Sequence, residues 1–308
     1  MTGEALRSEN LRKVYRSRGA PVVEALSGVS MEVRRGERVA LLGRNGAGKT
    51  TFLKIASTLL RPSSGTIEVF GCDVDRNPEK VRPYIAVVTQ EGKPFFHLTP
   101  REQVYTYLRA RGLSRETADS RTSEALERMG LTAVAGRLAI TLSGGQRQRT
   151  MVATVIATEA PLLFLDEPTI GMDPFARRDV WESLRVLTQR GSTMLLTTHY
   201  LDEAEALSHR LYIVERGQVI VSGTADDLKR SVGGTLKVAM PDGAAFVEQF
   251  RSFGDCVTDG SGLTVIVGPE RLGEIMEVAV RSHLTATVGP VTLEEAFLSV
   301  VGRSINED

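Results

Sequence analysis

The sequence predicts an α/β protein in which a covered, largely parallel sheet forms the main domain and a small α+β domain follows it. Short apolar runs alternate with helical segments across residues 5–230, a pattern typical of parallel strands buried on both faces. A glycine-rich loop joins an apolar run to a helical segment within residues 38–60, the order of a strand, loop and helix unit. The pattern changes again after Lys229, which indicates a second domain.

The opening part of the chain is expected to be rich in strands. Short β-type runs bounded by turn residues predict strands at residues 6–15, 22–25, 30–33 and 66–69. Residues 38–42 read as a buried strand, and residues 50–60 read as the helix after the glycine-rich loop. Further parallel-type strands are predicted at residues 85–88, 162–165, 193–197 and 210–214.

A helical subdomain, at about residues 91–160, is expected to interrupt the sheet. Thr99 and Glu102 form a capping box at the start of its first helix. A second helix is predicted at residues 114–129, and Ser143 is expected to cap a third one that continues to about residue 158.

The tail is predicted to be a separate accessory domain at residues 235–308, after a linker at residues 231–234. Its strands are expected at residues 235–240, 255–258, 262–267 and 285–288, and its helices at residues 243–253 and 269–282. This order of elements suggests a ferredoxin-like unit. A last helix is expected between about residues 292 and 302.

Composition indicates an ordinary globular protein. Of 308 residues, 42% are hydrophobic and 25% are charged, and 38 basic residues balance 38 acidic ones, so no nucleic-acid partner is expected. Cys72 and Cys256 form no paired motif, which disfavours a disulfide framework or a zinc site. No apolar stretch approaches the roughly 20 residues that cross a bilayer. Any membrane passage is therefore expected to belong to another chain.

The segment GRNGAGKT at residues 43–50 predicts a phosphate-binding loop. The backbone of such a loop encloses phosphate groups, its lysine reaches the β- and γ-phosphates, and its hydroxyl reaches Mg²⁺. Lys49 is the candidate lysine, Thr50 the candidate metal ligand, and Thr51 a further phosphate contact. The candidate nucleotide-binding residues here are Gly43, Asn45, Gly46, Ala47, Gly48, Lys49, Thr50 and Thr51.

The segment LSGGQ offers a second phosphate-binding helix N-terminus, because a serine and two glycines precede a helix. Its candidate ATP-binding residues are Ser143, Gly144, Gly145 and Gln146.

Two acids end the apolar run LLFLDEP at residues 162–168. A carboxylate at the end of a buried strand is costly without a cation, so Asp166 is the candidate for Mg²⁺ binding through water. Glu167 is the candidate general base. Gln90 and His199 also follow predicted strands, where Gln90 could sense Mg²⁺ and the attacking water and His199 could face the γ-phosphate.

In order and spacing these motifs resemble the nucleotide-binding subunit of ABC transporters over residues 5–230. The resemblance implies ATP and Mg²⁺ as cofactors, adenine stacking by Tyr15, a D-loop role for Asp173, and Q-loop and switch roles for Gln90 and His199. An aromatic residue ending a strand is as often a packing residue, so Tyr15 has a second interpretation. The family also implies a second ATPase subunit, a homodimer or related heterodimer, whose LSGGQ faces the phosphate loop.

A closer resemblance is to bacterial exporters of the daunorubicin-resistance ATPase type. Three segments carry it: TLLRPSSG at residues 58–65, LTPRE at residues 98–102 and VTLEEAFLSVVG at residues 291–302. Arg44, Met172 and Gln146 depart from the usual family pattern, but none of them removes a catalytic group.

This resemblance implies an exporter ATPase that drives a separate integral membrane permease from the cytoplasmic face of the cell membrane. Its cargo would be a drug, antibiotic, lipid or polysaccharide. The alternative is a soluble ABC ATPase acting on ribosomes or nucleic acid. The segment after Gln90 that contains Phe95, Phe96, His97 and Leu98 is the candidate dock for a short partner helix, and the alternative is that Phe95 and Phe96 pack the subdomain onto the sheet. The tail either supports the structure, regulates it, helps dimerisation or contacts the partner.

Overall fold

The computed structural model describes residues 3–16, 19 and 21–306, and the chain divides into two compact units. The first unit ends at Val219 and the second begins at Ile220. This division lies before the linker at residues 231–234 that the sequence suggests. The predicted end of the ATPase domain at residue 230 and the predicted start of the accessory domain at residue 235 therefore stay predictions.

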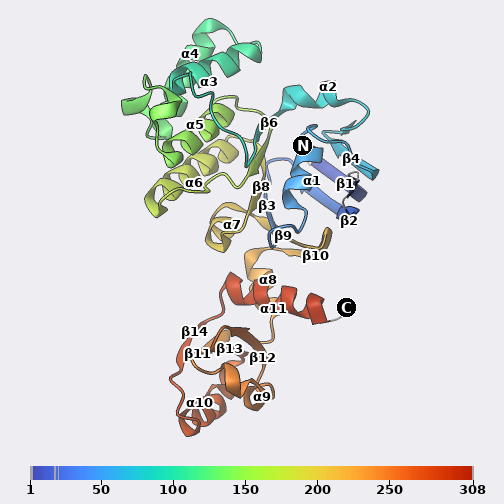
Figure 1. The fold of residues 1–308 in the computed structure, drawn as a ribbon, viewed down its shortest axis with the longest axis vertical. Coiled ribbons are helices and arrows are strands. Elements are labelled where there is room, and N and C mark those ends of the chain that lie inside the picture. Colours follow the sequence, from blue (N-terminus) through green and yellow to red (C-terminus); the bar gives the residue numbers. More distant parts are fainter. Residues whose placement is uncertain (1–2, 17–18, 20, 307–308) are drawn as a thin grey trace. The chain divides into compact units, whose positions relative to one another are not determined.

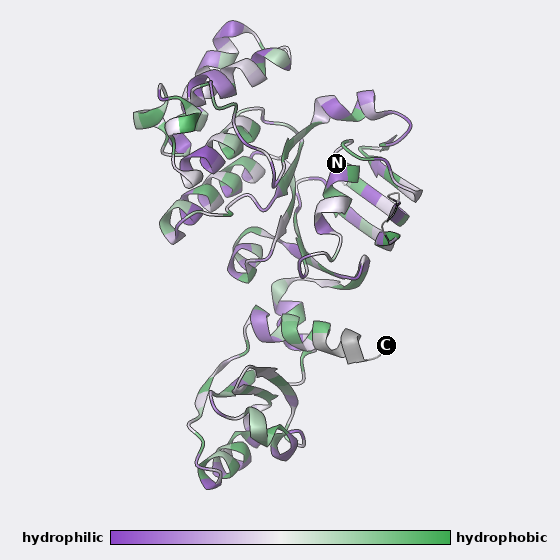
Figure 2. Ribbon diagram, in the orientation of Figure 1, coloured by the Kyte–Doolittle hydropathy of each residue, from purple (hydrophilic) through white to green (hydrophobic). Residues whose placement is uncertain are grey.

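A six-stranded sheet of order β10-β9-β3-β8-β7-β6 lies at the centre of the first unit, and the division between the two units falls within its edge strand β10. Its members are β3 (Arg38–Leu42), β6 (Ile85–Val88), β7 (Leu162–Asp166), β8 (Thr193–Thr198), β9 (Arg210–Glu215) and β10 (Gln218–Gly223). From β9 to β6 the neighbouring strands are parallel. The sequence-based prediction of a covered parallel sheet is confirmed, and Figure 2 shows hydrophobic residues along these strands.

An antiparallel sheet of order β2-β1-β4-β5 lies in the same unit. It contains β1 (Glu4–Tyr15), β2 (Val23–Arg34), β4 (Ser64–Val69) and β5 (Cys72–Asp73). Two strands were expected where β2 runs without a break. Gly28 explains the difference, because its φ of 102° lets the strand bend where a side chain would be strained.

Helices cover both faces of the six-stranded sheet, with α1 on one side and α5 to α7 on the other, while α3 and α4 pack against α5 (Figure 1). The bounds are α1 (Lys49–Ala56), α2 (Pro78–Val81), α3 (Pro100–Ala110), α4 (Arg115–Arg128), α5 (Gly144–Ile156), α6 (Pro174–Gln189) and α7 (Leu201–Leu207). The helix expected to reach residue 60 ends at Ala56. Ser57 donates its hydroxyl proton to the Leu53 carbonyl, and Thr58 then adopts a φ of 64°, which ends the helix.

The second unit has the ferredoxin-like arrangement that the sequence suggests. After α8 (Ala225–Ser231) come β11 (Leu236–Met240), α9 (Val247–Phe250), β12 (Asp255–Asp259), β13 (Gly262–Val267), α10 (Leu272–Arg281), β14 (Thr287–Pro290) and α11 (Leu293–Asn306). The sheet order is β12-β13-β11-β14, with antiparallel neighbours. The first expected helix is shorter than predicted, because residues 244–246 form a 3-10 turn before α9.

Candidate functional site

The glycine-rich loop lies between β3 and α1, and its shape depends on a left-handed backbone at Gly48 and on close backbone approaches that only glycine allows. Gly48 has a φ of 107°, and a Cβ atom there would lie 2.4 Å from the Ala25 carbonyl oxygen. A Cβ atom at Gly43 would lie 2.2 Å from the carbonyl oxygen of Val214. Both glycines are therefore required for the loop to pack closely enough to present its N–H groups to a phosphate.

Lys49 is buried at the start of α1, and its amine bridges the loop that a phosphate would occupy. Lys49 Nζ donates to the carbonyl oxygens of Gly43 at 2.7 Å and Arg44 at 3.1 Å. Burial lowers the pKa of Lys49, whereas the carboxylates of Glu167 and Asp166 oppose that shift. A cation held beneath the loop in this way is well placed to attract β- and γ-phosphate oxygens.

Asp166 ends β7 with its carboxylate buried and only one of its oxygens bonded. Its Oδ1 accepts hydrogen bonds from the hydroxyls of Thr50 and Thr197. Its Oδ2 is buried and has no hydrogen-bond partner. An unsatisfied buried carboxylate oxygen is costly, and a hydrated Mg²⁺ would remove that cost by water-mediated bonding. The Thr50 hydroxyl and this free oxygen therefore fit a magnesium ion.

Glu167, Gln90 and His199 lie together, although they follow three different strands. Glu167 Oε2 is 3.2 Å from His199 Nδ1 and 3.4 Å from Gln90 Nε2. Glu167 has a φ of 49° and is 7% exposed. A left-handed backbone at a non-glycine residue is strained and is often found at functional sites. The structure therefore brings together three of the four predicted catalytic side chains.

Thr197 belongs to this cluster but was not predicted to. The Thr197 hydroxyl donates to Asp166 Oδ1, and Thr197 Oγ1 also accepts the Glu167 backbone N–H at 3.2 Å. Asp166 and Thr197 are register partners in the parallel pair β7 and β8. The sequence carried this signal, since both residues end apolar runs whose carboxyl ends meet at one sheet edge.

Tyr15 ends β1 beside the phosphate-loop helix. Its hydroxyl lies 3.4 Å from Thr51 Oγ1, and its side chain is 39% exposed. The Lys13 amine lies 5.4 Å from the ring centroid. An exposed ring next to the phosphate loop has the position that base stacking requires, so adenine stacking stays a prediction that this geometry allows.

The LSGGQ residues form a helix start, as predicted, but they are not part of this cluster. Ser143 caps α5 in a capping box with Gln146, which occupies the Gln146 side chain. Gly144 and Gly145 begin the helix, and a Cβ atom at Gly145 would lie 3.8 Å from the carbonyl oxygen of Gly171. Within the described part of the chain, no hydrogen bond joins these residues to the phosphate loop.

Asp173 caps α6. Its Oδ1 accepts the backbone N–H groups of Phe175 and Ala176 at 3.0 Å each, and the bond from Ala176 is the main cause that lowers the pKa of Asp173. Its carboxylate is therefore ionised at the head of a helix. The sequence-based D-loop role remains a prediction.

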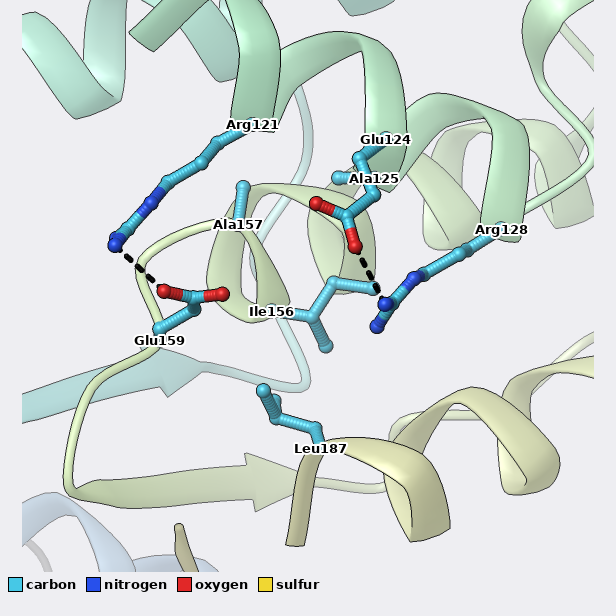
Figure 3. A pocket seen from close by; sticks show the side chains of 8 residues that line it. All are labelled: Arg121, Glu124, Ala125, Arg128, Ile156, Ala157, Glu159 and Leu187. Carbon is cyan, nitrogen blue, oxygen red and sulfur yellow. Dashed lines mark hydrogen bonds and ion pairs between the residues drawn. The ribbon is translucent and has the colours of Figure 1, made fainter. Parts of the chain in front are cut away.

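A small cavity between α4 and α6 lies apart from these residues (Figure 3). Arg121 pairs with Glu159, and Arg128 pairs with Glu124, on its two sides. Its volume of about 20 Å³ is close to the room that one water molecule needs. The cavity is therefore too small for a nucleotide.

Comparison with known proteins agrees with this site. The sequence profile of the family described as "ABC transporter" matches residues 26–170. The chain is 36% identical to the daunorubicin/doxorubicin resistance ATP-binding protein DrrA of Streptomyces peucetius, over 98% of this chain and 94% of that protein. The chain belongs to the ATP-binding subunits of ABC transporters.

Two further comparisons extend the similarity. The chain is 35% identical to the Nod factor export ATP-binding protein I of Burkholderia orbicola, over 97% of this chain and 98% of that protein. A solved structure of the ATP-binding cassette MJ0796, described as dimeric and in a post-hydrolysis state bound to ADP and Pi, matches 71% of this chain and 98% of its own. That match has a TM-score of 0.67 and 27% identity. This ABC subunit is accordingly an ATPase with a cassette fold.

No helix in the described residues has the length and apolar composition needed to cross a membrane.

Proposed function

We propose that this ABC subunit drives export of a drug, antibiotic, lipid or polysaccharide through a separate integral membrane permease, from the cytoplasmic face of the cell membrane. The observation that carries this proposal is the extent of the similarity to a drug-resistance protein and an export protein. It covers 97–98% of this chain and so includes the second unit as well as the cassette. The names of these relatives favour a transporter over a soluble ATPase that acts on ribosomes or nucleic acid.

The catalytic roles follow from the contacts at the strand ends. Glu167 would accept a proton from the water that attacks the γ-phosphorus, with His199 and Gln90 holding its carboxylate. Lys49 would leave the loop carbonyls and neutralise the β- and γ-phosphate oxygens. Bound Mg²⁺, held by Thr50 and through water by Asp166 and Gln90, would supply positive charge beside those oxygens.

The nucleotide site would be completed by a second ATPase subunit. Ser143 to Gln146 head α5 at the surface, and among the described residues they share no hydrogen bond with the phosphate loop of their own chain. A helix N-terminus of this kind binds anions, so it is free to face the γ-phosphate held by another copy. Two copies would then form two composite ATP sites, with Asp173 near each interface.

An exposed apolar patch in the helical subdomain would receive the permease. We define the docking patch as Phe95, Phe96, Leu138 and Ile140, which are 62%, 45%, 47% and 63% exposed. The Ile140 N–H donates to the Phe96 carbonyl, so the two loops that carry the patch are joined. Exposure on this scale disfavours the interpretation that Phe95 and Phe96 serve only to pack the subdomain onto the sheet. Clustered aromatic and aliphatic side chains fit a short amphipathic helix.

The experiment is affinity purification of the Glu167→Gln chain with ATP from its native membrane fraction, followed by identification of what is bound. We expect a multi-span membrane protein that is depleted when Phe95 and Phe96 are both changed to Ser. Leu59, which is 58% exposed outside the patch, gives a matched control as Leu59→Ser. Ribosomes or nucleic acid without a membrane protein would contradict the proposal.

A further inference from the structure

Glu203 is a fully buried acid in α7, the short helix that follows His199, and the catalytic cluster does not account for it. Its exposed fraction is 0%. Acidic side chains are almost never fully buried unless they are paired. The partners of this carboxylate should therefore show why it lies in the interior.

The carboxylate of Glu203 joins two other segments of the site. Its Oε1 accepts a hydrogen bond from Thr169 Oγ1 at 2.7 Å and from Trp181 Nε1 at 3.1 Å. Thr169 lies two residues after Glu167, the candidate base. Trp181 lies on α6, the helix that Asp173 caps. One oxygen atom thus connects α7 both to the loop after β7 and to α6.

A second link joins α6 to the residues next to His199. The Arg177 guanidinium lies 4.5 Å from the centroid of the Tyr200 ring and 3.8 Å from the carboxylate of Asp202. The Tyr200 ring centroid is in turn 4.1 Å from that of His199. The segment at residues 199–203 therefore contacts α6 at two points, and His199 is linked to α6 through the ring of Tyr200.

The remaining features of Glu203 agree with a specific role. Its Oε2 is buried without a hydrogen-bond partner. Burial raises the pKa of Glu203, and the side chains of Thr198, Thr169 and Trp181, which lie beside the carboxylate, oppose that shift. A buried acid that is only partly satisfied costs stability, whereas an apolar residue of similar size would avoid the cost. Such costs are tolerated most often where a site depends on them.

We propose that Glu203 is a positioning residue that couples His199 to the Glu167 loop and to the helix headed by Asp173. Through it, contact of His199 with a γ-phosphate would be passed to Trp181 and α6. The inference depends on the ATPase activity and is independent of the cargo and the permease, so its failure would leave the exporter proposal intact.

Steady-state ATPase kinetics of the full chain test this coupling. We expect Glu203→Leu to lower kcat at least tenfold and to leave KM for ATP within twofold, because the phosphate loop is unchanged. Glu203→Gln keeps an acceptor for Thr169 and Trp181, so it should retain at least a third of kcat. Ser183→Ala is the control for destabilised packing, since Ser183 is buried on α6 and bonds the carbonyl of Asp179.

Tryptophan fluorescence gives a readout that a purely structural role would not change. Trp181 is the only tryptophan of the chain, and its indole N–H is bonded to Glu203. We expect Mg·ATP to change its emission and Mg·ADP to change it much less. In Glu203→Leu the ATP-dependent change should be lost, although calorimetry still detects ATP binding.

Three results would overturn the proposal. The first is a folded Glu203→Leu chain whose kcat is within twofold of the parent value. The second is a loss of kcat in Glu203→Leu no greater than the loss in Ser183→Ala at equal thermal stability. The third is an ATP-dependent change in Trp181 emission that persists in Glu203→Leu. If Glu203→Leu does not fold, Thr169→Val and Trp181→Phe each remove one donor. Each should then lower kcat at least threefold, and unchanged kcat in both would equally overturn it.

Discussion

Two adjacent carboxylates at the end of β7 have different surroundings, and this difference assigns them different chemistry. Asp166 is enclosed by hydroxyl groups and keeps one oxygen unpaired. Glu167 turns the other way through a left-handed backbone and meets an imidazole and an amide. Environment rather than residue type thus separates the metal-facing acid from the candidate base.

The base is tested by Glu167→Gln. We expect ATP binding to persist and turnover to fall by about 10² to 10⁴-fold, the contribution typical of a positioned base. Single-turnover hydrolysis and equilibrium ATP binding measure the two effects. Glu116→Gln, an exposed change in α4, is the control. Turnover of the Glu167→Gln chain within threefold of the parent would remove Glu167 from this role.

The metal-facing acid is tested by Asp166→Asn. The Asn Oδ1 can still accept from Thr50 and Thr197, and the Asn amide nitrogen replaces a buried unpaired anionic oxygen by a buried unpaired neutral donor. We expect the free energy of unfolding without nucleotide to change by no more than about 1 kcal/mol, while Mg²⁺-dependent hydrolysis is lost. Chemical unfolding and ATPase assays measure both. If Asp166→Asn strongly lowers the free energy of unfolding in the absence of Mg²⁺, the main role of this carboxylate is instead to stabilise the fold.

At the scale of single elements, capping residues define the ends of several helices, and the cap of α8 leads to a prediction of how stability depends on pH. The Thr224 hydroxyl and backbone N–H, then Arg230, lower the pKa of Asp227 from 3.8 to about 2. Because the folded-state pKa is depressed, the stabilising contribution is present above about pH 4 and is lost as pH falls toward 2.

An NMR titration of the Asp227 carboxyl carbon checks the value. We expect a midpoint near pH 2, a return toward 3.8 in Thr224→Ala, and little change in Thr224→Ser, which keeps the hydroxyl. A midpoint near 3.8 in the parent protein would show that the capping box is not formed in solution.

Local signals in the sequence predict most of the elements. The caps at Thr99 and Ser143 are found where expected, because capping depends on neighbours within one turn. The end of α1 and the continuous β2 were missed. These depend on the backbone conformations of Thr58 and Gly28, which tertiary contacts select.

Long-range contacts explain what sequence reasoning missed at the site. Thr197 and Glu203 have no motif of their own, and Glu203 lies on a short helix where acids are normally exposed. Glu203 meets its partners only when α6 and α7 pack together, whereas Thr197, at the end of a predicted strand, could have been placed beside Asp166 from the parallel-sheet prediction. By contrast, the residues of the phosphate loop and Glu167 could be named as candidates from the sequence, because their chemistry requires fixed spacing along the chain.

At the scale of the whole molecule, the two phosphate-binding helix starts of one chain serve different sites in our proposal, and this leads to a complementation test. Lys49→Ala removes the phosphate-binding amine, and Ser143→Arg places a bulky cation on the LSGGQ helix start. Each variant alone should lack ATPase activity. A mixture should form heterodimers in which one composite site has an intact Lys49 from one chain and an intact Ser143 from the other.

Activity of the mixture follows from simple pairing. If the chains associate at random, half of the dimers are mixed and each has one intact site of two, so about a quarter of the parental activity should return when sites act independently. Tagged co-purification counts the mixed dimers, and ATPase assays measure the recovery. The control is a chain that carries both substitutions, mixed with the parent chain. A dimer of these two chains has an intact pair of motifs only if the two motifs act within one chain. Parental homodimers alone give the control mixture about a quarter of the parental activity. A control near one half of the parental activity, with no recovery in the first mixture, would show that LSGGQ acts on the nucleotide of its own chain.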